Sequence, residues 1–344
     1  MIGSKNMKLK LCNSYGELPL DIKEKLTNAN VFFEDVFCCY TNDTFTQVKY
    51  IYNDTYIQVV VVHSIRKLFM TASLPTEPFP LSDSGVDFTT QQMFLDDVME
   101  ILKKELHVDW LTVTPASTLF QAYPTKSERI KFGNYVLSLV GEDEDVFARI
   151  TSKHRNMIRR GEKSGVEVRF GGKELLDDYI VVDKQTWNRS GKITDNTEYY
   201  KKYLENFKDR SIIGVAYKDN VPQCGILGIY NEAMFYYMFG ASANHPEPGA
   251  THYLQWRTMQ YMRQKKVRCY NFVGCRLNVD AGSKYENIQR FKKGFGGELI
   301  ECYLFRVTFN YMKQKLFSAM LKARGGAVVQ DVIDQEIIKW AEIN

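Results

Sequence analysis

Two adjacent lysines lie between two phenylalanines and before a double glycine in the segment YENIQRFKKGFGGE at 285–298. Phe291 and Phe295 are four residues apart, so on a helix they share one face. Lys292 then lies between packing residues at a partly buried position, where its ammonium would stabilise negative charge developing on an acyl carbonyl. An amphipathic helix with two surface lysines, Lys292 and Lys293, gives the same pattern, and residue types alone favour that simpler interpretation.

A basic segment lies earlier in the chain, RITSKHRNMIRRGEKSGVEVR at 149–169, with seven Lys and Arg against two Glu. Three of its basic residues recur every fourth position and share one helix face: Arg155, Arg159 and Lys163. Such a stripe can hold phosphate groups, and a solvated face explains it equally well. His154 falls with Ile150 and Ile158 on another face, so we expect a packed structural histidine rather than a catalyst.

A loop rich in glycine and proline, GASANHPEPGATHYLQW at 240–256, leads into a predicted helix. Backbone N–H groups at a helix start attract anions, and a plain helix start is the equal alternative. No general base is identified, because Asp280, Tyr236 and Tyr237 are available without a predicted place in a site.

These segments must be positioned by a mixed framework, because strand and helix patterns alternate along the chain. The first half predicts strands at 9–11, 48–52, 56–62 and 109–113, helices at 20–26, 90–106 and 116–123, and a proline-rich loop at 74–87. The second half predicts helices at 142–164, 173–190, 196–207, 249–264, 285–293, 309–323 and 327–341. Its predicted strands are 133–141, 166–170, 211–218, 222–230, 233–241, 268–273 and 298–307.

The second half therefore has a three-stranded meander followed by helix, strand, helix and strand, which is the order of the acyl-CoA N-acyltransferase (GNAT) fold. A weaker echo of that order in the first half suggests two diverged copies. We expect an α/β (α+β) protein with two GNAT-like domains in tandem, at 1–132 and 133–310, followed by packing helices at 311–344.

Charge is divided unequally along the chain. Residues 1–145 hold 13 Lys and Arg against 20 Asp and Glu, a net of −7, and residues 146–344 hold 32 against 21, a net of +11, which together give +4. A basic half suggests that an anion is bound there, such as a phosphate ester, a nucleic acid or an anionic membrane. A basic but merely solvated surface is the alternative.

The composition argues against collagen-like, coiled-coil, disordered and transmembrane proteins. Hydrophobic residues make up 44% and charged residues 25%, as in ordinary globular proteins. The longest apolar run, at 59–62, is far below the roughly 20 residues that span a bilayer, and no signal peptide is visible, so we expect a cytoplasmic protein. Seven cysteines without a CxxC pair predict neither a zinc site nor a disulfide framework.

Six segments in order carry a resemblance to a known family: GNYVLSL, RRGEKSGVEVRF, YYMFGAS, YLQWRTMQYM, YNFVGC and FKKGFGGE. Over about 133–310 the chain resembles the Fem family, aminoacyltransferases that attach amino acids to peptidoglycan precursors. The resemblance implies two GNAT-like domains. Many members carry a coiled-coil insertion, and since this chain has no heptad segment, it would be a compact member.

The resemblance also implies roles for individual residues. Phe291 and Lys292 match the family's FK-x-x-F motif, whose lysine is thought to stabilise the acyl-transfer intermediate and to contact the RNA end of the donor. Arg189, in QTWNRSG, is similar to an arginine that contacts the acceptor's diphosphate. Further substrate contacts are expected from Arg155, Arg159, Lys163, Tyr237 and Lys293.

The leading hypothesis is an acyltransferase that moves an aminoacyl group from aminoacyl-tRNA to an amine of a peptidoglycan precursor or related envelope acceptor. It would need no tightly bound cofactor and no DNA. Its partners would be tRNA and the acceptor, with a peripheral position at the inner face of the membrane as a further option. The basic amphipathic segment at 311–324 could make that contact, although core packing is the simpler interpretation.

Two other functions stay open. A CoA-dependent N-acyltransferase acting on an amino sugar of a surface polysaccharide would use acetyl-CoA. Such relatives lack clear first-domain contacts, and the first-domain lysine of the Fem family likewise has no clear match in this chain near 32–40. The loop at 240–256 lacks the R/Q-x-x-G-x-G/A pattern usual in CoA-binding N-acetyltransferases, which favours the leading hypothesis. A non-catalytic RNA- or envelope-binding protein is the third possibility.

Overall fold

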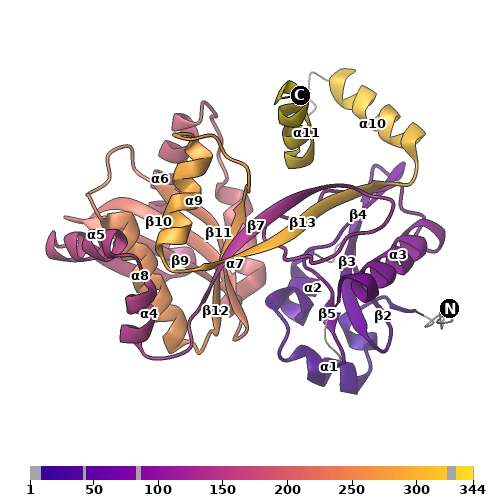
Figure 1. Ribbon diagram of the computed structural model, residues 1–344, viewed down its shortest axis with the longest axis horizontal. Helices are drawn as coiled ribbons and strands as arrows, with labels where there is room; N and C mark the ends of the chain where they lie inside the picture. The colour runs from indigo at the N-terminus through magenta and orange to yellow at the C-terminus, as the bar shows by residue number, and fades with distance from the viewer. Residues whose placement is uncertain (1–8, 42–43, 83–86, 324–330, 344) are drawn as a thin grey trace. The chain divides into compact units, whose positions relative to one another are not determined.

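The computed structural model describes residues 9–41, 44–82, 87–323 and 331–343. The chain forms two compact units: unit 1 comprises Met1–Gly133 and Glu301–Asn344, and unit 2 comprises Asn134–Ile300. Two strands, β7 (Glu128–Ser138) and β13 (Glu298–Thr308), carry the chain between them. Both units combine strands with helices (Figure 1), so the predicted α/β class is confirmed.

Unit 1 is built on a sheet with the order β1-β2-β3-β4-β6-β13, and β5 joins β3. The strands are β1 (Lys10–Cys12), β2 (Thr46–Tyr52), β3 (Tyr56–Ile65), β4 (Phe69–Ser73), β5 (Phe79–Pro80) and β6 (Trp110–Leu111). The helices are α1 (Leu20–Leu26), α2 (Asp35–Thr41), α3 (Phe88–Lys104), α10 (Tyr311–Ala323) and α11 (Val332–Ile343). Strands β2, β3 and β4 form an antiparallel meander, and β6 lies parallel to β4.

Helix α3 supplies much of the core of unit 1. Its side chains Phe94, Val98 and Leu102 are almost fully buried against the sheet. Met93, which the periodicity places among them, is 53% exposed instead. Counted at 100° per residue, Met93 falls on the side of the helix away from the buried residues, so its side chain is exposed.

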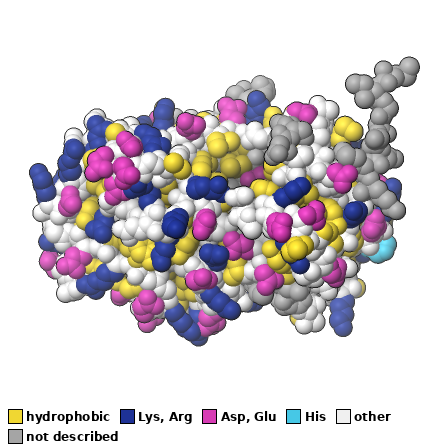
Figure 2. Space-filling view, turned by 90° about the horizontal axis from the view of Figure 1, so that it is seen from below, with side chains coloured by type: hydrophobic (Ala, Val, Ile, Leu, Met, Phe, Trp, Pro, Cys, Tyr) yellow, Lys and Arg dark blue, Asp and Glu magenta, His cyan; other side chains and the backbone are white. Residues whose placement is uncertain are grey.

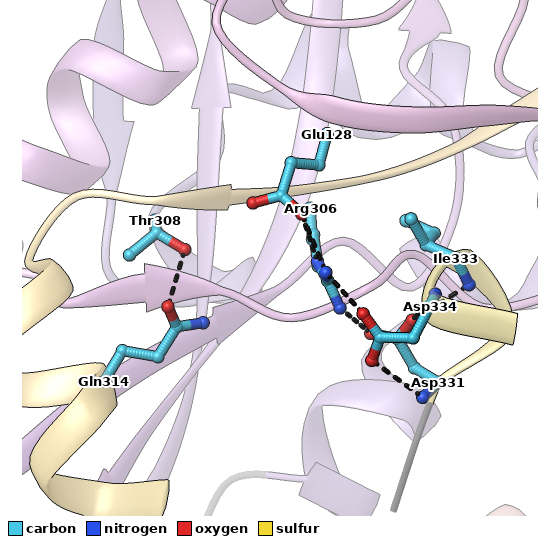
Figure 3. A network of polar contacts seen from close by, with 7 residues as sticks. All are labelled: Glu128, Arg306, Thr308, Gln314, Asp331, Ile333 and Asp334. Atoms are coloured by element: carbon cyan, nitrogen blue, oxygen red, sulfur yellow. Dashed lines mark hydrogen bonds and ion pairs between the residues drawn. The ribbon is translucent and has the colours of Figure 1, made fainter. Parts of the chain in front are cut away.

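The start of α11 is fixed to the strands of unit 1 by one arginine (Figure 3). The Arg306 guanidinium of β13 donates to Asp331 at 2.6 Å, to Asp334 at 2.7 Å and to Glu128 of β7 at 2.7 Å. Arg306 is partly buried, so these charge-assisted bonds are poorly screened and orient the helix.

Unit 2 has a sheet with the order β7-β12-β11-β10-β9-β8. Its strands after β7 are β8 (Glu167–Gly171), β9 (Ser211–Lys218), β10 (Val221–Tyr230), β11 (Met234–Ser242) and β12 (Cys269–Cys275). Its helices are α4 (Asp143–Arg149), α5 (Ser152–Lys163), α6 (Leu176–Arg189), α7 (Thr197–Phe207), α8 (Ala250–Gln264) and α9 (Lys284–Gly294). The meander β9–β10–β11 is antiparallel, and β12 lies parallel to β11.

Helices cover both faces of the unit 2 sheet. Neighbouring residues of a strand point to opposite faces: on β10, the Cys224 thiol lies at the Thr251 side chain of α8, whereas Gly225 lies under the Tyr179 ring of α6. Helix α5 packs on α8, and α7 packs on α6. Unit 2 is therefore a three-layer α/β/α structure.

The single helix predicted over 142–164 is wrong, because the chain breaks it into α4 and α5. Ile150 follows α4 with an extended backbone, ψ 136°. The Arg155 guanidinium, one turn into α5, donates to the carbonyls of Ala148 at 3.0 Å and Ile150 at 2.5 Å. It satisfies carbonyl oxygens that the end of a helix leaves without partners, which stabilises the break.

The helix predicted at 116–123 is also wrong. Its backbone groups bind elsewhere: Leu119 N–H donates to Glu77 Oε2 at 2.9 Å, and the Phe120 carbonyl accepts from Tyr303 N–H at 2.9 Å. The Phe120 ring is fully buried and meets the Phe305 ring edge-on. Tertiary contacts thus outweigh a local helical preference.

The two units differ less in charge than the two halves of the sequence. Unit 2 holds 26 Lys and Arg against 20 Asp and Glu, a net of +6, and the rest of the chain holds 19 against 21, a net of −2. The four acidic residues at 142–145 start α4 and so belong to the basic unit. On the face drawn in Figure 2, Lys and Arg side chains are interspersed with Asp and Glu.

Candidate active site

Two parallel strands of unit 2 separate at the carboxyl end of their pairing. Strand β11 pairs with β12 up to Tyr236, which lies opposite Asn271. The next residue along each strand, Tyr237 and Phe272, lines a cavity of about 740 Å³. Helix α9 closes another side with Phe291 and four further residues. The volume lies within the range of small-molecule sites, and the carboxyl end of parallel strands is a common place for them.

An irregularity in β11 shapes one wall of this cavity. Leu227 of β10 lies opposite Phe239, but Ile229 lies opposite Tyr236, so two residues of β11 face one residue of β10. Such a bulge bends the strand and re-aims its side chains. Gly240 allows the result, because a Cβ there would overlap the Tyr237 hydroxyl.

The opposite wall turns sharply at Val273. Its φ is +50°, a backbone conformation that β-branched residues rarely adopt. The turn directs two successive carbonyls, those of Val273 and Gly274, at one side chain of α9. Strain of this kind persists where the surrounding structure fixes it and is often found at functional sites.

That side chain is Lys292. Its Nζ donates to the Val273 carbonyl at 2.8 Å and to the Gly274 carbonyl at 2.6 Å, and the residue is only 8% exposed. Burial lowers the pKa of Lys292 to about 8, because it disfavours the charged form. An ammonium has three donors, so two backbone carbonyls hold it while one N–H remains for a group in the cavity. Lys293, the next residue and another expected substrate contact, is exposed and does not line the cavity, so we assign it no substrate contact.

Tyr237 is another polar side chain that the structure brings to this cavity. Burial raises the pKa of its hydroxyl far above the usual range, so the hydroxyl is neutral at pH 7 and can donate a hydrogen bond or a proton. We therefore expect it to act as a donor rather than as a general base. Asp280 is exposed, Tyr236 is buried, and neither lines the cavity.

The predicted histidine is packed under the end of α9. His154 of α5 is buried, and its Nε2 lies 3.0 Å from the Phe291 carbonyl. Its ring meets the His252 ring edge-on at 4.6 Å and the Phe295 ring at 4.9 Å. Burial lowers the pKa of both histidines, that of His252 to about 4.

The basic residues expected to bind substrate lie outside the cavity. Arg155 is engaged with the backbone at the break between α4 and α5. The Arg159 guanidinium lies 5.5 Å from the Phe147 ring centroid, and Lys163 is exposed. Arg189, at the end of α6, donates to the Ser242 carbonyl and hydroxyl, each at 2.9 Å. The structure thus unites Phe291, Lys292 and Tyr237 and leaves the arginines apart.

The glycine-rich loop before α8 packs against α5. Gly249 adopts φ +97°, and a Cβ on it would overlap the Met157 carbonyl and the Gly161 backbone of α5. The approach of these two backbones explains the glycines at both positions. This packing also covers part of the loop at 240–256, where we expected an anion to bind.

Metal-binding clusters and membrane-spanning helices are both absent from the described residues. No group of three or more His, Cys, Asp or Glu among them is arranged to hold a metal ion. Within the same residues, no helix is long and apolar enough to cross a membrane.

The comparison with known families decides the relationship of this chain. The model of the FemAB family matches residues 118–222 and 216–323, which together cover more than half of the chain. The chain belongs to the FemAB family. A curated relative, the lipid II:glycine glycyltransferase of Staphylococcus haemolyticus, is 25% identical over 119 residues, which are 34% of this chain and 28% of that protein. The match thus spans less than a third of the relative's length.

Solved structures show the same fold. The crystal structure of FemX matches with a TM-score of 0.66 at 13% identity and covers 90% of this FemAB chain and 99% of that one. A tandem GNAT protein of the clavulanic acid biosynthesis pathway matches with a TM-score of 0.52 at 10% identity, covering 87% and 98%. The predicted fold, two GNAT-like domains in tandem, is confirmed.

Several parts of the site left no signal in the sequence. The carbonyls of Val273 and Gly274 act through the backbone, and any residue type has a carbonyl. The bulge in β11 has one indirect signal, Gly240 three residues after Tyr237. His154 was visible as a core residue, but nothing indicated that its partner is the backbone beside Lys292.

Proposed function

We propose that this FemAB protein transfers an aminoacyl group from aminoacyl-tRNA to an amine of a peptidoglycan precursor. The observation that carries the proposal is the Lys292 ammonium, which two carbonyls hold at the edge of a cavity lined mainly by apolar residues. The name of the Staphylococcus haemolyticus relative, which couples lipid II with glycine, supports the acceptor class.

The reaction is an attack of the acceptor amine on the ester carbonyl of the donor. A C–N bond forms, the carbonyl oxygen becomes negative, and the C–O bond to the ribose then breaks. The remaining N–H of Lys292 stabilises the oxyanion. Phe291 and Phe272 exclude water, which strengthens that interaction and limits hydrolysis of the ester. The proton lost by the amine passes to the departing ribose oxygen.

Charge outside the cavity supports a polyanionic donor. Arg159 and Lys163 are exposed on α5, and unit 2 carries a net charge of +6. We assign these two residues to donor phosphates and Arg189 to the acceptor diphosphate. Arg155 is engaged with backbone carbonyls, so we expect its loss to affect folding more than binding.

A transfer assay tests donor and acceptor together. The protein is incubated with a pool of tRNA charged with radiolabelled amino acids and with lipid II, and separately with labelled acetyl-CoA and amino sugars. Label in the lipid II fraction with charged tRNA alone would support the proposal. Label in an amino sugar with acetyl-CoA alone would replace it by the CoA-dependent alternative. Binding of tRNA without transfer to any acceptor would favour a non-catalytic protein.

We further propose that α10 touches an anionic membrane surface, where a lipid-linked acceptor resides. On this helix Tyr311 is 62% exposed, Met312 83% and Leu316 55%. Lys315 and Lys322 are exposed beside them, and the helix has no acidic residue. An apolar face with flanking lysines suits the headgroup region of a bilayer.

Sedimentation with vesicles tests this contact. Vesicles with about 30% anionic lipid should retain the wild-type protein. K315E/K322E should weaken binding by about 30-fold or more, since each basic residue near such a surface is worth about 1 kcal/mol. The matched control is K103E/K126E, which reverses two exposed lysines outside α10. An equal loss of vesicle binding in the control would show that net charge alone explains the effect, and would contradict the contact through α10.

A further inference from the structure

The last turn of α9 is fixed from outside the helix. A helix leaves its last four carbonyls without intrahelical partners. Here Phe295 N–H and Gly296 N–H return to the carbonyls of Lys292 and Lys293, at 3.2 and 3.0 Å. The other two carbonyls, those of Phe291 and Gly294, are bound by side chains or backbone of α5 and the residue before it.

The bonds from this end of α5 form a clamp on either side of Lys292. His154 Nε2 lies 3.0 Å from the Phe291 carbonyl. Thr151 donates to the Gly294 carbonyl from its N–H at 2.9 Å and from its hydroxyl at 3.1 Å. The clamp therefore engages the residue before Lys292 and the residue two positions after it.

The chemistry of His154 fixes which nitrogen carries its proton. A carbonyl accepts hydrogen bonds, so Nε2 must be the protonated nitrogen. Nδ1 is buried without a partner among the described residues, which suits the neutral imidazole, because an N–H there would be an unsatisfied buried donor. A neutral ring is also consistent with the pKa of His154, which burial lowers.

Packing leaves the imidazole little freedom to move. A Cβ on Gly294 would overlap the His154 ring, so the ring lies directly on the backbone of α9. The rings of His252 and Phe295 meet it from two other sides.

We propose that His154 is a positioning residue for Lys292. Its Nε2–H holds the Phe291 carbonyl and thereby fixes the turn of α9 that directs the lysine at the carbonyls of Val273 and Gly274. The role rests on the proposed function of Lys292, because His154 lies outside the cavity lining and acts through the backbone. Loss of the bond frees the turn and admits water to the ammonium.

The test measures the lysine itself. In protein labelled with [13Cε]lysine, the resonance of Lys292 is the one missing from K292R, and its pH titration gives the pKa directly. The wild-type value should lie near 8. H154F keeps a ring but removes the donor, so the Lys292 pKa should rise by about one unit or more toward the ordinary 10.4 as water reaches the ammonium.

Two amide variants, H154Q and H154N, separate the effect of side-chain length from the effect of a polar group. H154Q places an N–H near the position of Nε2 and should keep the Lys292 pKa within about 0.3 of wild type. H154N carries the same group one bond shorter and should raise it as H154F does. H245F, at an exposed histidine, is the control for the substitution and should change nothing. If H154F does not fold, the two amides decide.

Two results would overturn the positioning role. One is a Lys292 pKa that stays within about 0.3 of wild type in folded H154F and H154N. The other is a wild-type Lys292 that titrates at the ordinary value. The titration needs no substrate, so an absence of transfer by the wild type would count against the proposed function alone. Where transfer occurs, kcat should fall in H154F and H154N while KM changes little, and H154Q should restore it.

Discussion

Units 1 and 2 share a strand arrangement and differ in the segment after it. In each, an antiparallel meander lies beside a parallel strand: β6 beside β4 in unit 1, and β12 beside β11 in unit 2. In unit 2 the chain then turns through Val273 into α9, which brings Lys292 to a cavity. In unit 1 the segment at 116–123 forms no helix, and Phe120 is buried against Phe305.

The two units therefore differ in the segment that follows β6 or β12. In unit 1 this segment buries an aromatic ring, whereas in unit 2 it leads into a helix that presents a lysine to a cavity, which is the candidate site. Unit 1 should therefore respond to mutation mainly through stability, and unit 2 mainly through activity.

The largest expected effect is on the stability of unit 1. F120A removes a fully buried ring and should lower the free energy of unfolding by about 3–5 kcal/mol. Denaturant titration measures this change, with F45A, whose ring is 53% exposed, as the control. Transfer per folded molecule, assayed well below the melting temperature, should stay within about twofold of wild type. A large loss of transfer by folded F120A would contradict the division between the units.

The next effect is on the activity of unit 2. K292A removes the lysine that two carbonyls hold at the cavity wall, and should reduce kcat by about 10²–10³-fold, as loss of an oxyanion donor does. K293A, which removes the exposed neighbour, should stay within about twofold. Single-turnover transfer from charged tRNA measures both. Equal losses of transfer in K292A and K293A would mean that both lysines act only as part of a general basic patch.

A smaller effect should appear at alkaline pH. The pKa of Lys292 is lowered to about 8, and the charged form is the one that stabilises an oxyanion. As pH rises through that value the ammonium is lost, so the transfer rate should fall about tenfold per pH unit beyond it. K292R keeps its charge and should lose this falling limb while retaining some activity. If the wild-type transfer rate began to fall only above about pH 10, the pH dependence would belong to another group.

The smallest effect concerns stability in acid. His252, whose pKa in the folded protein is about 4, takes up its proton near pH 6.5 when unfolded. The unfolded state thus binds more protons between these values, and stability present above about pH 6.5 is lost toward pH 4, by at most about 3 kcal/mol. H252F should flatten that slope, measured as melting temperature against pH, and H245F should not. Parallel slopes in all three proteins would exclude His252 as the cause.

Sequence patterns predicted the framework of unit 2 well because its periodicities are unambiguous. The meander of β9, β10 and β11 and the helices α6, α7, α8 and α9 lie within a few residues of the predicted ranges. The prediction failed where distant residues decide the backbone: Arg155 stabilises the break in 142–164, and contacts with β13 and Glu77 replace a helix at 116–123. Strand β4 and helix α2 were not predicted.

The candidate site was predictable only in its side chains. Phe291 and Lys292, expected to be catalytic, and Tyr237, expected to contact substrate, all line the cavity. Their roles in transfer stay predictions. The carbonyls of Val273 and Gly274 and the clamp from His154 depend on backbone positions brought together by the fold, so no residue type marks them. Dividing the sequence after Asp145 exaggerated the difference in charge between the two units, because the acidic residues at 142–145 start α4 and so belong to unit 2.

The most direct test of the assignment to unit 2 is a crystal structure with a stable mimic of the donor end, a 3′-aminoacylamino-3′-deoxyadenosine. We expect the mimic in the unit 2 cavity, with its aminoacyl carbonyl oxygen about 2.7–3.2 Å from Lys292 Nζ. The same complex of K293A should look alike. A mimic bound away from this cavity, with Lys292 still bonded only to Val273 and Gly274, would contradict the assignment of the chemistry to unit 2.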